Sequence, residues 1–351
     1  MRTEDFKEFV KTAKKFYDRK NRVPICDNVL FYGSTAKIVN LTDEISVAMN
    51  TGDVTFEKPF IISFLEFEKV INKVKSSPIS FSVNGNNQIS VETNKGTFTF
   101  QNEKEEELED FPLFPKDESG LKLFTTISIN ELELIKKAEN FVAVDELRPM
   151  MCNVLIDKNN IVGTDSYSLC FYPSETERER SFVIPKKIAK HISLSKNNIT
   201  VMLDEIGKHT AAIVDGNVTI FYKQTDGIYP NYMAVIPTDN PISVIVDTKE
   251  FMEVLDTSSI SMNPSSEMVR LETKGNELSL QTQDIDLSKS FKGTVKAKTE
   301  GDDIAIGFNY SKMVNLLKAE KQNKTTFNFS DPNRAMIINE YCLLMPMSVN
   351  G

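Results

Sequence analysis

The sequence predicts an α+β fold that is built three times over, with two helices and several antiparallel strands in each third of the 351-residue chain. Three observations predict it. Six segments carry apolar residues at helical spacing, and β-branched or aromatic runs lie between them. The second helix of each pair begins near residue 63, 185 or 309, so these starts are 122 and 124 residues apart. A single small module is excluded, because one domain usually holds roughly 100 to 200 residues.

Six helices are predicted, and most of them begin at a capping residue or a proline. In chain order they cover residues 6–22, 63–75, 128–142, 185–193, 247–256 and 309–324. Ser63, Ser128 and Asp247 are each followed three residues later by a glutamate, which is the pattern of a capping box. We therefore expect these three residues to be N-caps.

Short strands are predicted between the helices, separated by turns rich in glycine and asparagine. The clearest runs are residues 89–92, 97–100, 212–214, 218–222 and 277–281. A weak sequence similarity between the first two thirds supports the threefold repeat. Residues 24–30 and 149–155 share proline, asparagine, valine and leucine, and Thr42-Asp43 recurs as Thr164-Asp165. Matches this short also arise by chance. Proline-rich stretches at 111–115 and 237–241 divide the chain into predicted domains 1–121, 122–240 and 241–351.

Positive charge is concentrated on the helices of an acidic chain. The whole chain has a net charge of −9, whereas the six predicted helices together carry +8. In the first helix Lys7, Lys11 and Lys14 lie opposite an apolar stripe, and Lys186, Lys187 and Lys190 crowd the fourth helix. Lysines also simply solvate exposed helix faces. The concentration of net positive charge on one class of element nevertheless indicates a local, sequence-independent surface for a phosphate backbone.

Enzymatic motifs are not found in the sequence. Its two histidines, His191 and His209, are too few for a multi-histidine metal site, and no phosphate-binding glycine loop occurs. The cysteines, Cys26, Cys152, Cys170 and Cys342, are far apart, so we expect reduced thiols. We therefore expect no catalytic residues, no metal, no cofactor and no enzymatic activity. With no leader-like or membrane-spanning stretch, the sequence predicts a soluble cytoplasmic protein.

Four motifs in order make the chain resemble the bacterial DNA polymerase III beta subunit, the sliding clamp family. They are residues 146–155 (ELRPMMCNVL), 163–169 (GTDSYSL), 226–237 (DGIYPNYMAVIP) and 341–347 (YCLLMPM). The resemblance implies the DNA clamp fold: three-domain subunits that close head to tail as a homodimeric ring around duplex DNA. It also implies that DNA polymerase and a clamp loader are partners.

The resemblance assigns residues to two further roles. Lys20, Arg22 and Arg148 lie where the family contacts phosphates, and they complete a predicted DNA-binding set with the lysines of the first and fourth helices. That set is Lys7, Lys11, Lys14, Lys20, Arg22, Arg148, Lys186, Lys187 and Lys190. By the same analogy, a dimer interface would contain Thr97, Phe98, Phe100 and Ile260.

The family also binds partner peptides in an apolar groove. Its expected residues here are Met151, Thr164, Ser166, Tyr167, Ser168, Leu169, Pro230, Ala234, Val235, Leu343, Leu344, Met345, Pro346 and Met347. The run from Leu343 to Met347 also fits an ordinary buried last strand. Ser166-Tyr167-Ser168 replaces the usual Gly-His-Arg, and Ala234 replaces a common basic residue, so the chain is a divergent example. Two other functions stay open: a metal-dependent nucleic-acid hydrolase and a purely structural repeat protein.

Overall fold

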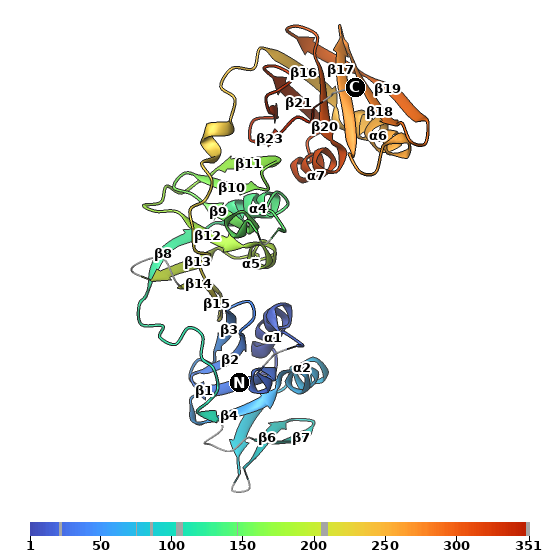
Figure 1. The fold of residues 1–351 in the computed structure, drawn as a ribbon. Helices are drawn as coiled ribbons and strands as arrows, with labels where there is room; N and C mark the ends of the chain where they lie inside the picture. The colour runs from blue at the N-terminus through green and yellow to red at the C-terminus, as the bar shows by residue number, and fades with distance from the viewer. Residues whose placement is uncertain are drawn as a thin grey trace. The chain divides into compact units, whose positions relative to one another are not determined.

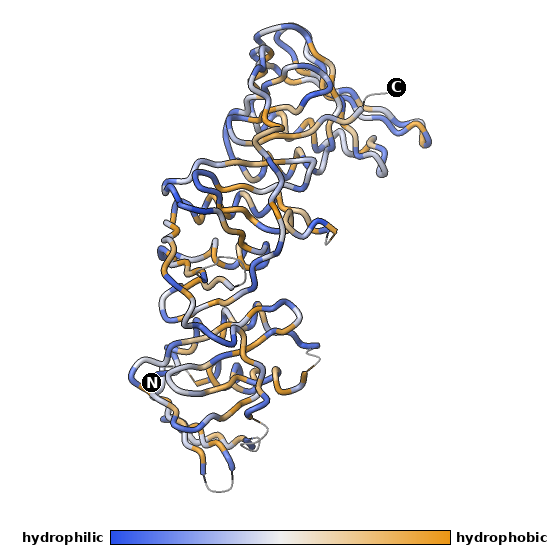
Figure 2. Tube along the Cα trace, turned by 60° about the vertical axis from the view of Figure 1, so that its left-hand side comes forward, coloured by the Kyte–Doolittle hydropathy of each residue, from blue (hydrophilic) through white to orange (hydrophobic). Residues whose placement is uncertain are grey.

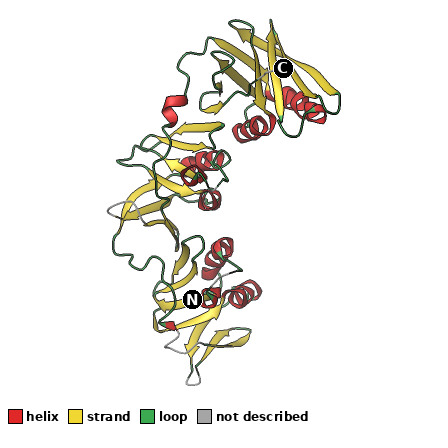
Figure 3. Cartoon of the chain, viewed as in Figure 1, coloured by secondary structure: helices red, strands yellow, loops and turns green. Residues whose placement is uncertain are grey.

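The computed structural model describes residues 1–20, 23–74, 76–84, 87–102, 108–145, 147–204 and 210–348. The chain forms two compact units. The first comprises residues 1–129 and 194–226, and the second comprises residues 130–193 and 227–351. Helices and strands are labelled in Figure 1 and coloured by type in Figure 3.

The first unit is built on an eight-stranded antiparallel sheet in the order β4-β1-β2-β3-β15-β14-β13-β8, with a separate three-stranded sheet β5-β6-β7. Helices α1 (Asp5–Phe16) and α2 (Phe64–Lys73) lie together on one face of the larger sheet (Figure 1). The strands are β1 (Asn28–Gly33), β2 (Thr35–Asn40), β3 (Ile45–Asn50), β4 (Phe56–Ser63), β5 (Ile79–Val83), β6 (Gln88–Thr93), β7 (Gly96–Gln101), β8 (Leu121–Ile127), β13 (Ile199–Asp204), β14 (Thr210–Asp215) and β15 (Val218–Lys223).

The second unit is built on a twelve-stranded sheet in the order β12-β9-β10-β11-β23-β22-β21-β16-β19-β18-β17-β20. Its helices are α4 (Ile129–Ala138), α5 (Lys186–Ile192), α6 (Thr248–Ser258) and α7 (Tyr310–Glu320). The strands are β9 (Asn153–Ile156), β10 (Asn160–Thr164), β11 (Ser168–Pro173), β12 (Phe182–Pro185), β16 (Ile242–Asp247), β17 (Met268–Lys274), β18 (Glu277–Asp284), β19 (Lys289–Glu300), β20 (Ala305–Asn309), β21 (Lys324–Phe329), β22 (Met336–Ile338) and β23 (Cys342–Leu344).

The same strand order occurs three times along the chain. The orders β4-β1-β2-β3, β12-β9-β10-β11 and β20-β17-β18-β19 are equivalent. The strand written first in each order is the last of the four along the chain, and it leads directly into α2, α5 or α7. The similar segments, residues 24–30 and 149–155, lie at matching places in the first two copies. Their asparagines, Asn28 and Asn153, each donate a side-chain hydrogen bond to a carbonyl of the preceding 3-10 turn, at 3.0 and 2.7 Å. The sequence similarity between the two segments therefore has a structural cause.

All six predicted helices form, and the five predicted strand runs lie within β6, β7, β14, β15 and β18, so these predictions are confirmed. Three helices end at least four residues earlier than predicted, because polar side chains or a backbone reversal terminate them. Asn40 donates to the Phe16 carbonyl at 2.8 Å, where α1 ends. Asn140 donates to the Lys136 and Lys137 carbonyls beyond α4, and Lys321 ends α7 with a left-handed φ of 52°.

The predicted N-caps have different outcomes. Asp247 accepts a hydrogen bond from the Glu250 amide at 3.0 Å, as a capping residue should, and Asn309 caps α7 through the Lys312 amide in the same way. Ser63 occupies the N-cap position of α2, but its side chain makes no capping hydrogen bond. The prediction of a capping box at Ser63 was therefore wrong, although the start of the helix was right.

Apolar side chains fill the space between helices and sheets. In the first unit the core is rich in phenylalanine: the rings of Phe6 and Phe67 meet edge to face at 5.3 Å, and those of Phe31 and Phe60 stack at 4.8 Å. Figure 2 shows apolar segments within strands and helices, interrupted by polar loops. The regularly spaced apolar residues form one face on each helix, and burial of that face is the driving force that holds the helix against the sheet.

Candidate functional site

An apolar groove lies in the second unit, between the β10–β11 turn, the 3-10 helix η3 (Tyr232–Val235) and β23, and it encloses about 200 Å³. Its lining combines aliphatic, thioether and aromatic side chains with a few hydroxyl groups. The lining residues are Met151, Thr164, Ser166, Tyr167, Ser168, Leu169, Pro230, Asn231, Tyr232, Val235, Leu343 and Met345. Such a surface can receive a short apolar peptide and adapt to it.

The sheet provides the floor of the groove. Leu169 of β11 is directly opposite Leu343 of β23, and both are almost completely buried. Tyr232 closes one side, and its hydroxyl donates to the Asp157 carboxylate at 2.8 Å. Burial, together with this hydrogen bond to a carboxylate, raises the pKa of Tyr232 to about 12. The phenol of Tyr232 is therefore un-ionised at neutral pH.

Most of the residues predicted for the groove lie in its lining, but Ala234, Leu344, Pro346 and Met347 do not. Ala234 is exposed on η3. Leu344 is buried, and as the neighbour of Leu343 it points to the opposite face of the strand. Met347 pairs with β20 through a hydrogen bond from its amide to the Gly307 carbonyl at 2.8 Å, so the chain has left the groove there.

Asn231 and Tyr232 line the groove but were not predicted from the sequence. Both lie inside the quoted motif of residues 226–237, between Pro230 and Val235. A buried tyrosine in a loop with neighbouring apolar residues was the available signal, because such a ring needs both packing and a hydrogen-bond partner.

Arg148 lies at the groove rather than among the helices. Its Nη1 atom donates to the Ser166 hydroxyl at 2.5 Å, and that hydroxyl lies 3.1 Å from the sulfur of Met151. Ser166 and Met151 both line the groove. The structure therefore brings together Arg148, which was predicted to contact DNA, and two residues predicted for peptide binding.

The lysines predicted on α1 are exposed and are paired with carboxylates. Lys7 lies 3.6 Å from Glu4, Lys11 lies 3.5 Å from Glu8, and Lys14 lies 2.6 Å from Glu68. The two pairs in which both partners are exposed, Lys7–Glu4 and Lys11–Glu8, contribute little to stability.

The other predicted cations have different surroundings. Lys187 and Lys190 are exposed on α5, Lys186 is half-buried there, and Lys20 is exposed beyond the end of α1. Arg22 lies outside the described residues.

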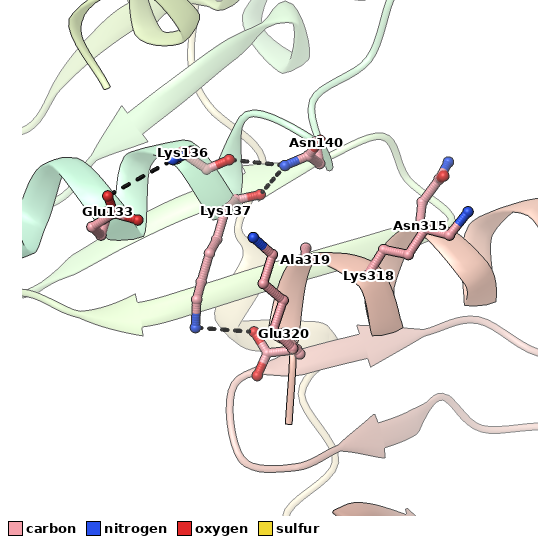
Figure 4. Close-up of a pocket in the computed structure, with 9 residues that line it drawn as sticks. Glu133, Lys136, Lys137, Asn140, Asn315, Lys318, Ala319 and Glu320 are labelled. Carbon is pink, nitrogen blue, oxygen red and sulfur yellow. Dashed lines mark hydrogen bonds and ion pairs between the residues drawn. The ribbon is translucent and has the colours of Figure 1, made fainter. Parts of the chain in front are cut away.

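A second, cationic pocket lies between the C-terminal ends of α4 and α7 and encloses about 340 Å³ (Figure 4). Lys137 reaches from α4 to Glu320 of α7, at 3.6 Å, and Glu320 also accepts a hydrogen bond from the buried Tyr172 hydroxyl at 2.6 Å. Lys136, Lys318 and Lys321 line the same pocket.

This pocket was not predicted from the sequence, because the net charge of the helix at 128–142 is slightly negative. An average over the whole helix hides cations gathered at one end, where the helix dipole also favours them.

Comparison with known proteins gives a consistent result along the whole chain. Residues 233–342 match the family model described as the C-terminal domain of the DNA polymerase III beta subunit. The beta sliding clamp of Bacillus subtilis is 24% identical over 330 residues, which are 89% of this chain and 85% of that protein. The clamp of Chlamydia muridarum is 21% identical over 365 residues, covering 97% and 96%. By sequence the chain is therefore similar to the DNA polymerase III beta subunit family, and the family model itself matches its C-terminal part.

Solved structures show that the chain has the DNA clamp fold. The crystal structure of the DNA polymerase III subunit beta from Pseudomonas aeruginosa matches it with a TM-score of 0.84 at 19% identity, over 99% of both chains. The beta subunit from Thermotoga maritima matches with a TM-score of 0.82 at 21% identity, over 99% of this chain and 98% of the other. The low identities show that the sequence has diverged from these relatives.

The relatives that the chain matches are beta sliding clamps. Within the part of the chain that the structure describes, no three His, Cys, Asp or Glu side chains gather into a metal-binding group. None of the helices formed by described residues is long and apolar enough to cross a membrane.

The residues predicted for the clamp's dimer interface are accessible in the single chain. Phe98 and Phe100 are half-buried and Thr97 is exposed on β7, which is an edge strand because it pairs with β6 alone. Ile260 is 75% exposed on the 3-10 helix η4 (Ser259–Ser261). Edge strands are open to further strand pairing. The interface itself stays a prediction.

Proposed function

We propose that this chain is a DNA sliding clamp, which closes as a head-to-tail homodimer around duplex DNA and tethers a replicative DNA polymerase. The observation that carries the proposal is the clamp fold over 99% of the chain, together with an apolar groove assembled from the motifs of the resemblance. A closed ring stays on DNA by topology, which is why an acidic chain with modest local positive charge suffices.

In this proposal the chain has three domains, residues 1–121, 122–240 and 241–351. The strand order that occurs three times supports this division. The dimer forms where β7 of one copy meets the region around Ile260 of the next, since an edge strand and an exposed apolar side chain suit such a joint.

The helices bind the DNA backbone through lysine, without reading its sequence. The predicted cations of α1 and α5 contribute, and we add Lys136, Lys318 and Lys321 of the α4–α7 pocket to them. Contacts of this kind give a salt-dependent affinity and allow the clamp to slide.

The apolar groove binds segments of the polymerase, the clamp loader and other partners. Its volume and its aliphatic and thioether lining suit the side chains of a short apolar peptide. Arg148 at its edge replaces some of the donor groups that Ser166-Tyr167-Ser168 and Ala234 lack relative to the usual family pattern. A protein with these partners works in the cytoplasm.

Retention on circular DNA tests the proposal. The protein is mixed at high concentration with a closed circular plasmid, isolated on it by gel filtration, and then treated with a restriction enzyme that cuts once. We expect slow release from the circle and rapid release after cutting, with a dimer in analytical ultracentrifugation. Equal release from both DNA forms would rule out a sliding ring. The relatives reported above are clamps, and none of them supports the hydrolase alternative.

A further inference from the structure

Lys312, near the start of α7, contacts the turn that forms one rim of the groove. Its ammonium group forms an ion pair with Oδ2 of Asp165, although the two residues are 147 positions apart. The Asp165 side chain is only 10% exposed and that of Lys312 is 37% exposed. A carboxylate as buried as this one needs a positive partner or several hydrogen bonds.

The other oxygen of Asp165 organises the turn. Oδ1 accepts hydrogen bonds from the amide of Tyr167 at 3.0 Å, the amide of Ser168 at 2.7 Å and the hydroxyl of Ser168 at 2.9 Å. Ser166, in the middle of the turn, has a left-handed φ of 77°, which a residue other than glycine adopts only when its surroundings hold it there. Ser166, Tyr167 and Ser168 all line the groove. One carboxylate therefore sets the shape of this rim.

The helix presents Lys312 from a fixed position. The Lys312 amide donates to the Asn309 side chain at 3.0 Å, which caps α7, and the following residues Met313, Leu316 and Leu317 are buried. The backbone that carries Lys312 is thus anchored, and the charge that meets Asp165 comes from a rigid element.

We propose that Lys312 is a positioning residue of the partner-peptide groove: through Asp165 it holds the 165–168 turn in the form that receives the peptide. This inference rests on the proposed function of the groove. Lys312 itself does not line the groove, so its effect on a peptide passes through the turn. By pairing with Asp165, Lys312 also compensates a negative charge that lies beside an apolar site.

Peptide affinity and hydrogen exchange test the proposal together. The probe is a fluorescein-labelled short peptide of leucine, phenylalanine and serine, chosen to match the aliphatic, thioether, aromatic and hydroxyl side chains of the lining, and it is measured by fluorescence polarisation on the full chain. We expect Lys312→Met to weaken binding about tenfold, as for contacting residues that couple. Lys312→Arg should restore most of the affinity. Hydrogen exchange measured without peptide should be faster across residues 164–170 in Lys312→Met. The matched control is Lys249→Met, an exposed lysine on α6 with no assigned role, which should change neither quantity.

A double-mutant cycle separates the charge from the fold of the turn. Asp165→Asn keeps an oxygen that can accept from Tyr167 and Ser168 but removes the charge that Lys312 meets. In that background Lys312→Met should change affinity less than about twofold. Unchanged peptide affinity and unchanged exchange in the single variant Lys312→Met would overturn the proposal while leaving the groove in place. Failure of the wild-type protein to bind the peptide, with normal retention on circular DNA, would overturn the groove assignment and this inference together.

Discussion

Arg178 and Glu131 form an ion pair in the interior of the second unit. The Nη2 atom of Arg178 lies 2.9 and 3.0 Å from the two carboxylate oxygens of Glu131, and both side chains are at most 1% exposed. The pair links α4 to the loop between β11 and β12, with Ser174 bonded to both partners. Removing one partner leaves a buried charge without compensation.

We expect Arg178→Met to lower the free energy of unfolding by about 3–5 kcal/mol, measured by urea denaturation. The double variant Arg178→Met/Glu131→Leu should recover part of that loss, because no charge then remains buried. Lys249→Ala is the control: it removes an exposed pair with Glu253 at 4.0 Å and should change stability by less than about 1 kcal/mol. A single variant as stable as the wild type would contradict the role of the pair.

Gly163→Ala should destabilise the protein and disturb the strand that leads into the groove. A Cβ atom at Gly163 would lie 2.3 Å from the Ala138 carbonyl oxygen, so α4 and β10 could not keep their present distance. We expect a loss of about 1–3 kcal/mol in thermal or chemical denaturation. Gly120→Ala meets nothing within 4 Å and serves as the control. Equal stability of both variants would show that α4 moves away freely.

Met345→Ala should weaken peptide binding and leave the dimer intact. Met345 lines the groove at the end of β23, and its amide bonds to the Tyr167 carbonyl at 2.8 Å, an interaction that alanine retains. We expect a loss of about tenfold in peptide affinity from the missing side chain. Unchanged affinity in a folded, dimeric variant would refute the assigned groove. Truncation after Tyr341 is a poorer test, because it deletes the buried strand β23.

Lysines of the α4–α7 pocket should contribute to the salt dependence of DNA binding. We expect Lys318→Ala and Lys321→Ala each to reduce the slope of log K against log salt by roughly one unit per lost phosphate contact. Lys298→Ala on β19, whose lysine is 72% exposed and paired with Glu300, is the matched control. The measurement is a filter-binding titration at several salt concentrations. An unchanged slope in the pocket variants would exclude these lysines from the DNA surface.

Asp157 should make stability depend on acid pH. Burial opposes its ionisation, but hydrogen bonds from Ser181, the Lys158 amide and Tyr232 outweigh that effect and hold the pKa of Asp157 below its usual range. The unfolded chain therefore takes up this proton at a higher pH than the folded one, and the contribution to stability is lost as pH falls through the folded pKa. In Asp157→Asn, the free energy of unfolding measured with urea should depend less on pH below about pH 5. An unaltered pH profile would contradict this assignment.

The sequence predicted helix positions well and helix ends poorly, for a physical reason. Helical periodicity and caps are local, so they can be recognised within a few residues. The end of α1 is fixed instead by Asn40 on β2, which bonds to the Phe16 carbonyl from a distant part of the chain. Nothing within the residues 6–22 indicates that contact.

The groove likewise has residues that could be predicted from the sequence and contacts that could not. The order of the sequence motifs allowed most of the lining residues to be predicted. The alternation of side chains along a strand would also have shown that Leu343 and its neighbour Leu344 point to opposite faces, so that only one of them can line the groove. The contact between Lys312 and Asp165 left no local signal, because it joins a helix and a turn that meet only in the folded sheet. The same holds for Arg178, which has no sequence pattern that links it to Glu131.

Strand β23 is inserted between β11 and β22, with Cys170 directly opposite Cys342. During synthesis on the ribosome, β11 therefore has an open edge until residues 342–344 have been made. Contacts this distant in sequence form slowly, and unpaired edges invite association with other nascent chains. We expect the second unit to complete its folding later than the first unit, whose residues have all been made by position 226, and to depend on chaperones more.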